Sequence, residues 1–304
     1  MKEFSVTVLG SSAAIATNDR NLTSQLINHF NRLFLIDCGE GTQFRLRQMH
    51  VRTNKIHHIF ISHLHGDHFF GLIGLLSTMH LFRRTEELTV YGPPRLQEII
   101  DIQLEASETK LFYPLKFKTT QAERDEVIYD DGRLTVSTFP LKHRVPTTGF
   151  LFREKQQPMH INKQAVDRYG VPLVYYNSLR KGLDYITGDG EVIPNNLLTL
   201  PADIARSYAY CSDTMYSEDT VKYIEGCDLL YHEATFANDL KETAAEKMHS
   251  TNVQAAMIAK KAAVKKLLLG HFSARYEDLE PLLAEARKVF GETYLSEESV
   301  AVYI

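Results

Sequence analysis

The sequence Ile56-His57-His58-Ile59-Phe60-Ile61 runs directly into Ser62-His63-Leu64-His65-Gly66-Asp67-His68. Its first part is rich in isoleucine and aromatic residues, which predicts a buried strand. Its second part places three imidazoles and one carboxylate in the spacing H-x-H-x-D-H. With 13 His in 304 residues, chance gives such a run on the order of once per thousand chains. A metal site is therefore predicted where this strand ends, because imidazole nitrogen and carboxylate oxygen are ligands of ions such as zinc.

The same four groups argue against a purely structural reading of the motif. Buried together without a metal ion, they would face a large desolvation cost and mutual repulsion. A loop at a strand end is able to turn His63 and His65 toward one ion, and Asp67 and His68 toward a neighbouring one. The motif therefore predicts two adjacent metal ions.

Length and composition indicate a single globular core with an inserted segment. Hydrophobic residues make up 44% and charged residues 24% of the chain, close to an average globular protein, which excludes a disordered chain. No apolar run approaches the ~20 residues that a transmembrane helix needs, and residues 1–9 lack the pattern of a secretory signal. We therefore expect a cytoplasmic protein with no membrane partner.

Charge and cysteine content limit the class of partner further. The net charge of −4 and a pI near 6.4 give no global attraction to polyanions, so a nucleic acid must be bound by local basic groups. Three scattered cysteines cannot form a disulfide framework. Reduced thiols are expected at Cys38, Cys211 and Cys227.

Strands and helices are mixed in both halves of the chain, a pattern that suits two sheets packed face to face with helices outside. Periodicity alone does not separate this arrangement from a doubly wound sheet. Predicted strands are residues 4–9, 33–36, 56–61, 88–91, 134–139, 208–212, 229–232 and 267–270. Predicted helices are residues 41–49, 69–81, 94–104, 251–264 and 278–290.

Between residues 153 and 200, Gly, Pro and Asn interrupt every apolar run. We interpret residues 155–200 as a flexible arm inserted into a single domain of residues 1–304. The alternative is a long surface loop without a role, although long loops in compact domains are usually functional or disordered.

Three downstream motifs follow the first one in an informative order: Lys142-His143-Arg144, Cys211-Ser212-Asp213-Thr214 and Leu269-Gly270-His271. Each histidine alone is more often a hydrogen-bonded structural residue, but the order of the motifs resembles the metallo-β-lactamase superfamily. This resemblance implies an αββα sandwich with two zinc ions per subunit. It assigns His63, His65, His143 and Asp213 to one zinc, and Asp67, His68, Asp213 and His271 to the other.

The carboxyl-terminal third narrows the resemblance. The motifs His232-Glu233-Ala234-Thr235-Phe236 and His249-Ser250-Thr251 resemble those of the tRNase Z family, the tRNA 3′ processing endonucleases. Further motifs similar to this family start at Asn21, Asp37, Pro140 and His271, so the resemblance covers nearly everything except the arm. It implies a homodimer that cuts precursor tRNA and leaves a 3′-hydroxyl on the tRNA and a 5′-phosphate on the trailer.

The resemblance also implies catalytic roles. Residue His249 would protonate the departing 3′ oxygen, Glu233 would orient that imidazole and raise its pKa, and Asp67 would position or accept a proton from the attacking water besides binding metal. The plainer readings are a cap for Glu233, a surface histidine for His249 and a structural role for His232. Lys142 and Arg144 either meet phosphate oxygens or are solvated charges.

The arm departs from the bacterial pattern, in which a Gly-Pro motif grips the tRNA elbow. The matching place reads Gly170-Val171-Pro172. Exposed cations and aromatic rings remain as candidates for RNA contact: Lys155, Lys163, Arg168, Tyr175, Tyr176, Arg180 and Lys181.

Rival functions share the same motifs in part. One is a hydrolase of a thioester, lactam, sulfate ester or cyclic phosphodiester on the same scaffold, since fold does not fix function. Others are an RNA-binding protein with a relic metal site, which predicts lost ligands, and a nuclease that also trims other RNAs.

Manganese or iron fits the same donor set. Trailer length and discrimination against a terminal CCA are expected to depend on residues near 21–24 and 273–276.

Overall fold

The computed structural model of the chain describes residues 3–304; the first two residues of the predicted 1–304 domain lie outside them. The chain forms two compact units. The larger comprises the residues up to Tyr129, Val136–Phe152 and Ser207–Ile304, and the smaller comprises Asp130–Thr135 and Arg153–Arg206.

The first sheet of the larger unit joins the two ends of the chain, because its first and last strands pair in antiparallel register, with Ser5 opposite Tyr303. Strands β4 to β7 run parallel to one another. The strand order is β20 (Ala301–Tyr303), β1 (Phe4–Gly10), β3 (Ser24–His29), β4 (Arg32–Ile36), β5 (Ile56–Phe60), β6 (Leu88–Gly92) and β7 (Leu115–Thr119).

The second sheet brings together the carboxyl ends of three parallel strands. Cys211 lies opposite His232, and Glu233 lies opposite Gly270, so the residues that follow these strands meet at one edge. The order is β19 (Thr293–Leu295), β17 (Lys266–Gly270), β16 (Leu229–Glu233), β15 (Ser207–Cys211), β10 (Thr147–Glu154), β9 (Leu134–Leu141) and β8 (Glu126–Asp130). A separate two-stranded sheet pairs β2 (Ser12–Ala13), which follows β1, in parallel with β18 (Phe272–Ser273), which follows β17.

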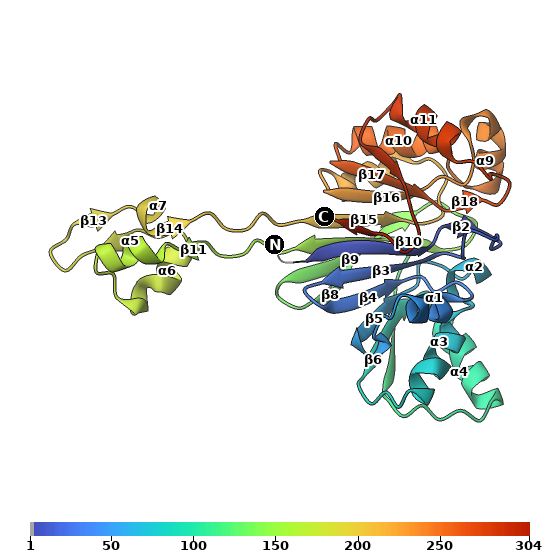
Figure 1. The fold of residues 1–304 in the computed structure, drawn as a ribbon, viewed down its shortest axis with the longest axis horizontal. Coiled ribbons are helices and arrows are strands. Elements are labelled where there is room, and N and C mark those ends of the chain that lie inside the picture. Colours follow the sequence, from blue (N-terminus) through green and yellow to red (C-terminus); the bar gives the residue numbers. More distant parts are fainter. Residues whose placement is uncertain (1–2) are drawn as a thin grey trace. The chain divides into compact units, whose positions relative to one another are not determined.

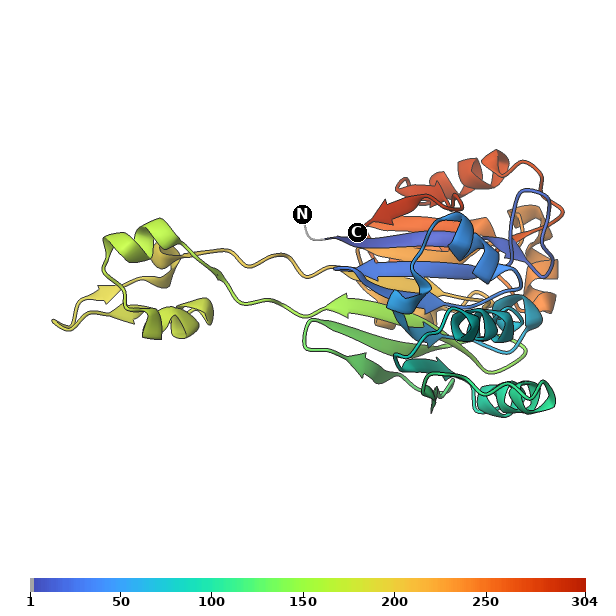
Figure 2. The same cartoon turned by 60° about the horizontal axis from the view of Figure 1, so that its bottom comes forward.

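Helices cover the outer faces of the two sheets, which gives the αββα sandwich (Figures 1 and 2). One group of helices is α1 (Thr42–Gln48), α2 (Gly66–Phe69), α3 (Leu72–Leu81) and α4 (Leu96–Ala106), with η1 (Thr53–Lys55) before β5. The other is α8 (Val221–Ile224), α9 (Lys241–Lys247), α10 (Asn252–Lys261) and α11 (Glu280–Arg287), with η3 (Glu218–Thr220) and η4 (Asn238–Leu240).

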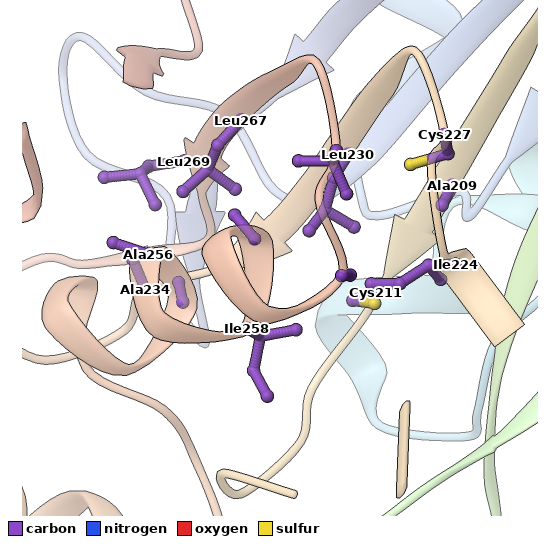
Figure 3. Packing of buried hydrophobic residues seen from close by; sticks show 14 of the residues in the cluster. Ala209, Cys211, Ile224, Cys227, Leu230, Ala234, Ala256, Ile258, Leu267 and Leu269 are labelled. Carbon is purple, nitrogen blue, oxygen red and sulfur yellow. The ribbon is translucent and has the colours of Figure 1, made fainter. Parts of the chain in front are cut away.

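Apolar packing joins these layers. Between the sheets, Phe60 of β5 meets Phe152 of β10 edge to face at 5.5 Å, a favoured aromatic geometry. Outside the second sheet, Leu230 and Leu267 pack with Ala256 of α10 (Figure 3). The small alanine side chains let α10 approach the sheet closely. All three cysteines are buried free thiols, as predicted.

The smaller unit has a core of its own and is not a structureless loop. The side chains of Val166, Val171, Leu179, Tyr185, Ile193 and Leu198 are buried together. Its elements are β11 (His160–Ile161) paired with β14 (Thr199–Leu200), β12 (Tyr185–Ile186) paired with β13 (Val192–Ile193), α5 (Lys163–Arg168), η2 (Leu173–Tyr175), α6 (Tyr176–Arg180) and α7 (Asn195–Leu198).

Candidate metal centre and active site

The structure brings all seven predicted metal ligands to the edge where the strands end. One group of donor atoms within 4.8 Å of one another comprises His63, His65, His143 and Asp213, and another comprises Asp67, His68 and His271. These residues follow β5, β9, β15 and β17, or lie on the short helix α2. They come from four separate places in the sequence, and the fold brings them together at one centre.

The donor set fits divalent cations. The Nε2 atoms of His63 and His143 each lie 3.1 Å from Nδ1 of His65, and the Nε2 atoms of His68 and His271 lie 3.2 Å apart. Asp213 Oδ1 is buried without a hydrogen-bond partner. Converging nitrogens and an unpaired buried carboxylate oxygen are the arrangement that bound cations satisfy.

Surrounding groups fix which nitrogen each histidine presents. The His143 Nδ1–H donates to the Met248 carbonyl at 2.9 Å, and His271 Nδ1 lies 2.9 Å from Thr235 Oγ1. With Nδ1 engaged, each ring turns Nε2 toward the centre. His65 is the exception, because its Nδ1 is the atom that faces the other two imidazoles.

Electrostatics keep the carboxylates ionised and three of the imidazoles neutral. His68 differs, because burial opposes its protonation but Asp213, Asp67 and Asp37 outweigh burial and raise its pKa. Burial lowers the pKa values of His63, His65 and His143. Burial opposes ionisation of Asp213 and Asp67, but nearby imidazoles still hold both of their pKa values below the usual range. Anionic oxygens and neutral imidazoles are the protonation states that bind metal.

Asp37, which the sequence did not single out as a site residue, supports the donor set from behind His68. Its Oδ2 accepts hydrogen bonds from His68 Nδ1 at 2.8 Å, Ser62 Oγ at 2.9 Å and Tyr210 Oη at 2.7 Å. Its Oδ1 accepts from the Ser62 backbone at 2.7 Å. A carboxylate so fully bonded holds the His68 ring in one orientation. The sequence feature that could have indicated Asp37 is its position directly after the predicted strand of residues 33–36.

Beside the metal donors lies the predicted pair of His249 and Glu233. Glu233 Oε1 accepts from His249 Nδ1 at 2.8 Å and from Thr214 N at 2.9 Å, and its Oε2 accepts from Thr235 N and Oγ1. Burial opposes protonation of His249, but Glu233 outweighs it and raises the pKa of His249 to about 9. Because Nδ1 is bound, Nε2 is the atom left to exchange a proton.

Local structure explains the position of His249. Met248 ends α9 in the left-handed region at φ 56°, so the chain turns sharply and offers its carbonyl to His143. Ser250 Oγ donates to the Thr214 carbonyl at 2.7 Å, and Thr251 caps α10 in a capping box with Gln254. Hydrogen bonds on both sides of His249 therefore hold the turn of residues 248–251 beside the metal donors.

The other sequence candidates lie at the margin of this centre. His232 is buried, with its Nδ1 2.7 Å from the Glu233 carbonyl oxygen, and it belongs to neither donor group. Lys142 pairs with Asp219 at 2.6 Å on the surface, and Arg144 is exposed. Within the second donor group, Asp67 Oδ2 accepts from Ala14 N at 2.8 Å, which anchors this carboxylate.

Comparison with known structures identifies the fold. Human tRNase Z, short form, superposes with a TM-score of 0.71 at 27% identity and covers 98% of each chain. The metallo-β-lactamase fold protein YhfI from Bacillus subtilis gives a TM-score of 0.70 at 20% identity over the full length of both chains. The fold and the donor set define a metallohydrolase of the metallo-β-lactamase fold.

Sequence relatives define the family. Proteins named ribonuclease Z are 46% identical in Phocaeicola vulgatus and 47% identical in Bacteroides thetaiotaomicron, over 100% of this chain and 98% and 96% of theirs. A family model described as anti-Pycsar protein Apyc1 matches residues 4–157, a range that omits Asp213, Glu233, His249 and His271. The chain belongs to the ribonuclease Z family, and its first half also falls within that Apyc1 family model.

Membership in this family supports an endoribonuclease over two of the rival readings, the small-molecule hydrolase and the binding protein with a relic metal site. Within residues 3–304, no helix combines the length and apolarity that crossing a membrane requires.

Proposed function

We propose that the chain removes the 3′ trailer from precursor tRNA and leaves a 3′-hydroxyl on the tRNA and a 5′-phosphate on the trailer. One observation carries this proposal: the His249–Glu233 pair lies against the metal donors, with the His249 ring 4.9 Å from that of His143 and 5.6 Å from that of His271. A proton donor next to a two-metal donor set suits displacement at a phosphodiester.

Two zinc ions per subunit are assigned to this centre. His63, His65, His143 and Asp213 would hold one, and Asp67, His68, Asp213 and His271 the other. When bound, the two ions lower the pKa of water and stabilise charge on the phosphoryl oxygens. Asp213 Oδ1 lies 3.3 Å from His68 Nε2 and 3.2 Å from His271 Nε2. Its Oδ2 lies 3.6 Å from His63 Nε2 and 3.7 Å from His143 Nε2, which supports the assignment of Asp213 as the shared ligand.

The residues of the chain supply the proton steps. His249 Nε2 gives a proton to the departing 3′ oxygen of the tRNA, and Glu233 keeps the ring charged and oriented for that transfer. Asp67 Oδ2 is engaged by Ala14 N and faces His68 and His271. Its other oxygen is therefore the one assigned to position the attacking water.

A first experiment maps cleavage of a 5′-labelled precursor tRNA by the zinc-loaded protein and by His249→Ala. We expect one cut directly after the discriminator base, lost on chelation and reduced by about 10² or more in the variant. His50→Asn is a matched control, because His50 is an exposed histidine in left-handed backbone at φ 54° that asparagine also adopts. Intact RNA with hydrolysis of a small phosphodiester would remove the tRNA assignment.

A second experiment separates an acid from a ligand at His249, because Asp213, His249 and His271 also form a group of converging donors. Zinc content per chain should be the same in His249→Ala and in the unaltered protein if His249 is the acid. Loss of one zinc in the variant would instead make His249 a ligand.

We further propose that the smaller unit, predicted as the arm of residues 155–200, binds the RNA. Lys163 and Lys181 are exposed cations, and the Tyr175 ring is 42% exposed. The resemblance to the tRNase Z family supports a homodimer in which one arm holds the RNA that the partner cuts. A precursor tRNA substrate places such an enzyme in the cytoplasm.

A further inference from the structure

A cavity of about 300 Å³ opens on the larger unit, on the face of the first sheet that α1 covers. It lies at the end of the sheet where β4 and β5 begin, opposite the end that carries the metal donors. The lining residues that matter here are Glu3, Ser5, Asn28, Asn31, Arg52 and Lys55.

The segment that forms one wall of the cavity contains several cations and no acid. Residues 41–66 include no aspartate or glutamate, and their arginines and lysine are Arg45, Arg47, Arg52 and Lys55. The chain as a whole carries a net charge of −4. Because the whole chain does not attract a polyanion, a local excess of positive charge is needed to hold one.

Arg52 and Lys55 are not engaged in other contacts. Both line the cavity and are exposed, and among the described residues neither side chain has a hydrogen bond or an ion pair. Arg47 belongs to the last turn of α1, where a cation stabilises the carbonyl end of the helix. That explanation does not extend to Arg52 and Lys55, because they lie beyond α1. These two side chains are therefore available to a ligand.

Two tight turns fix the walls of the cavity. Asn31 adopts the left-handed region at φ 65° in the turn between β3 and β4, and its N–H donates to Asn28 Oδ1 at 2.9 Å. On the other side, the backbone of His50 turns at φ 54°. Val51 N then donates to the Leu46 carbonyl at 2.9 Å, which closes the end of α1. The cavity is thus shaped before any ligand arrives.

Neutral groups beside the cations add hydrogen-bonding capacity. Because Asn28 Oδ1 accepts from Asn31 N, the Asn28 Nδ2 remains as a donor, and Asn31 is itself exposed. Glu3 is the one carboxylate among the described residues of the lining, and its Oε1 accepts from Ser5 Oγ at 3.2 Å. The cations of the lining therefore outnumber its carboxylate, and the amides stand beside them, which suits a phosphate with a neighbouring hydroxyl.

The composition of the lining indicates which kind of phosphate fits. A nucleotide base is usually held on an aromatic side chain, and no phenylalanine or tyrosine belongs to the described lining. Double-stranded RNA is recognised instead by contacts to its phosphates and 2′-hydroxyls, with little reading of base sequence. Arg52 and Lys55 match the phosphates, and the two asparagine amides match the hydroxyls, which donate and accept hydrogen bonds.

Helix α1 joins the cavity to the metal centre. Gly39, which precedes the helix, packs so closely on Asp67 that a Cβ would lie 2.6 Å from the Asp67 carbonyl oxygen. The helix ends at Gln48, next to the cavity wall. Along β5, the extended chain from Lys55 to His63 spans about 25 Å. A contact at that distance from the cut phosphate falls on the stem of the tRNA and not at its cut end.

We propose that the cavity binds a backbone phosphate of the double-stranded stem of the tRNA substrate, through Arg52 and Lys55. The inference rests on the proposed function. Because the contact is far from the metal donors, it strengthens binding of the RNA and takes no part in the chemical step. Its loss therefore changes KM and leaves kcat as it is.

The first test follows the salt dependence of cleavage. Values of kcat and KM on precursor tRNA are measured at several salt concentrations for the unaltered protein and for the double variant Arg52→Gln, Lys55→Gln. At low salt the variant should raise KM about tenfold, and the slope of log kcat/KM against log salt should become shallower by about 1 to 2, because phosphate contacts are lost. Hydrolysis of an aryl phosphodiester should be unchanged, since the metal centre is intact.

A matched control removes the same charge elsewhere on the larger unit. Lys260 and Lys288 are exposed cations near the ends of α10 and α11. The double variant Lys260→Gln, Lys288→Gln should leave KM and the salt slope unchanged. Glu3→Gln removes the carboxylate of the lining and should lower KM, the opposite change.

The second test locates the phosphate on the RNA. A methylphosphonate, which replaces one charged backbone oxygen by a methyl group, is placed at each stem phosphate in turn. At one or two neighbouring positions it should lower kcat/KM for the unaltered protein. The same substitution should cause no further loss for the double variant Arg52→Gln, Lys55→Gln, because both changes remove one contact.

The outcomes separate this inference from the function on which it rests. Equal salt slopes in the unaltered protein and the double variant, or additive losses at every stem position, would overturn the stem contact and leave the proposed function intact. Calorimetric binding of inorganic phosphate that the double variant loses, with unchanged kinetics on RNA, would assign the cavity to a free phosphate and also overturn the inference. Failure of the unaltered protein to cut any precursor tRNA would overturn the proposed function and the stem contact with it.

Discussion

The Glu233 carboxylate controls the protonation of His249, which leads to a prediction about pH. The pKa of His249 is raised to about 9, so the acid form is present below that pH and is lost above it. Glu233→Gln removes the anion, and burial then lowers the pKa. We expect cleavage of precursor tRNA to decline at a lower pH in the variant than in the unaltered protein, measured as kcat between pH 5.5 and 10.

The control for this prediction is a phosphodiester with an aryl leaving group. A phenolate departs without a proton donor, so its hydrolysis should follow the same pH profile in both proteins. An equal shift on both substrates would mean that Glu233 acts on the metal centre and not through His249.

Asp37 leads to a second prediction at the residue scale. Asp37→Asn takes a negative charge from His68 and replaces an acceptor by an amide that cannot accept from all of its present donors. Zinc affinity should fall by about 10- to 100-fold, measured by competition with a chromogenic chelator. Tyr210→Phe, which removes one hydrogen bond to Oδ2, should give a smaller loss, and unchanged affinity in both variants would refute the role.

The sequence predicted the residues that meet at the centre better than the contacts that support them. His63, His65, Asp67 and His68 stand within six positions, so their proximity follows from the chain itself. The hydrogen bond between Asp37 and Tyr210 joins the residue after β4 of the first sheet to β15 of the second, and the sequence carries no local sign of that pairing. The structure therefore shows where the site side chains lie, whereas the catalytic and metal-binding roles of these residues stay predictions.

At the scale of elements, the strongly periodic segments were predicted well and the interrupted ones were not. Strands β1, β5 and β17 lie where the apolar runs predicted them. The helix predicted for residues 69–81 begins three residues later, at Leu72 of α3, and Phe69 is the last residue of α2. Between them, Gly71 packs against Gly39, where a Cβ would lie 2.0 Å from the Gly39 carbonyl oxygen. Strands β3 and β10 were missed, since they gain their stability from neighbouring strands.

The smaller unit leads to the third prediction. Glu154 and Arg206 pair at 2.8 Å, so a short Gly-Ser linker in place of residues 156–203 keeps this pair. The change should greatly reduce cleavage of precursor tRNA, because it removes the proposed RNA-binding cations, and should spare an aryl phosphodiester. Both rates are compared with those of the unaltered protein, and equal loss on the two substrates would defeat the role of the arm.

A milder variant tests whether the fold of this unit matters. Asn195 is buried, and its Nδ2 donates to the carbonyls of Leu179 and Leu183 at 2.7 and 2.8 Å. Asn195→Ala removes both hydrogen bonds and leaves the Leu183 carbonyl without this donor, which costs about 1–3 kcal/mol, whereas the Leu179 carbonyl keeps the Gly182 N–H at 2.9 Å. Hydrogen exchange should therefore increase in residues 153–206 and stay unchanged at the metal centre, and exchange raised throughout the chain would contradict the independence of the two units.

The proposed homodimer is tested at the scale of the whole molecule by mixing two defective proteins. The linker variant keeps the metal centre but lacks the arm, and His249→Ala keeps the arm but lacks the acid. If one subunit's arm holds the RNA that its partner cuts, a dimer of the two variants contains one intact arm and one intact centre that serve each other. Co-refolded mixtures should then cut precursor tRNA faster than the summed rates of the separate proteins.

A mixture in which the linker variant also carries His249→Ala is the control and should stay inactive. Activity no greater than the sum, with mixed dimers present in native mass spectra, would mean that each arm serves its own subunit.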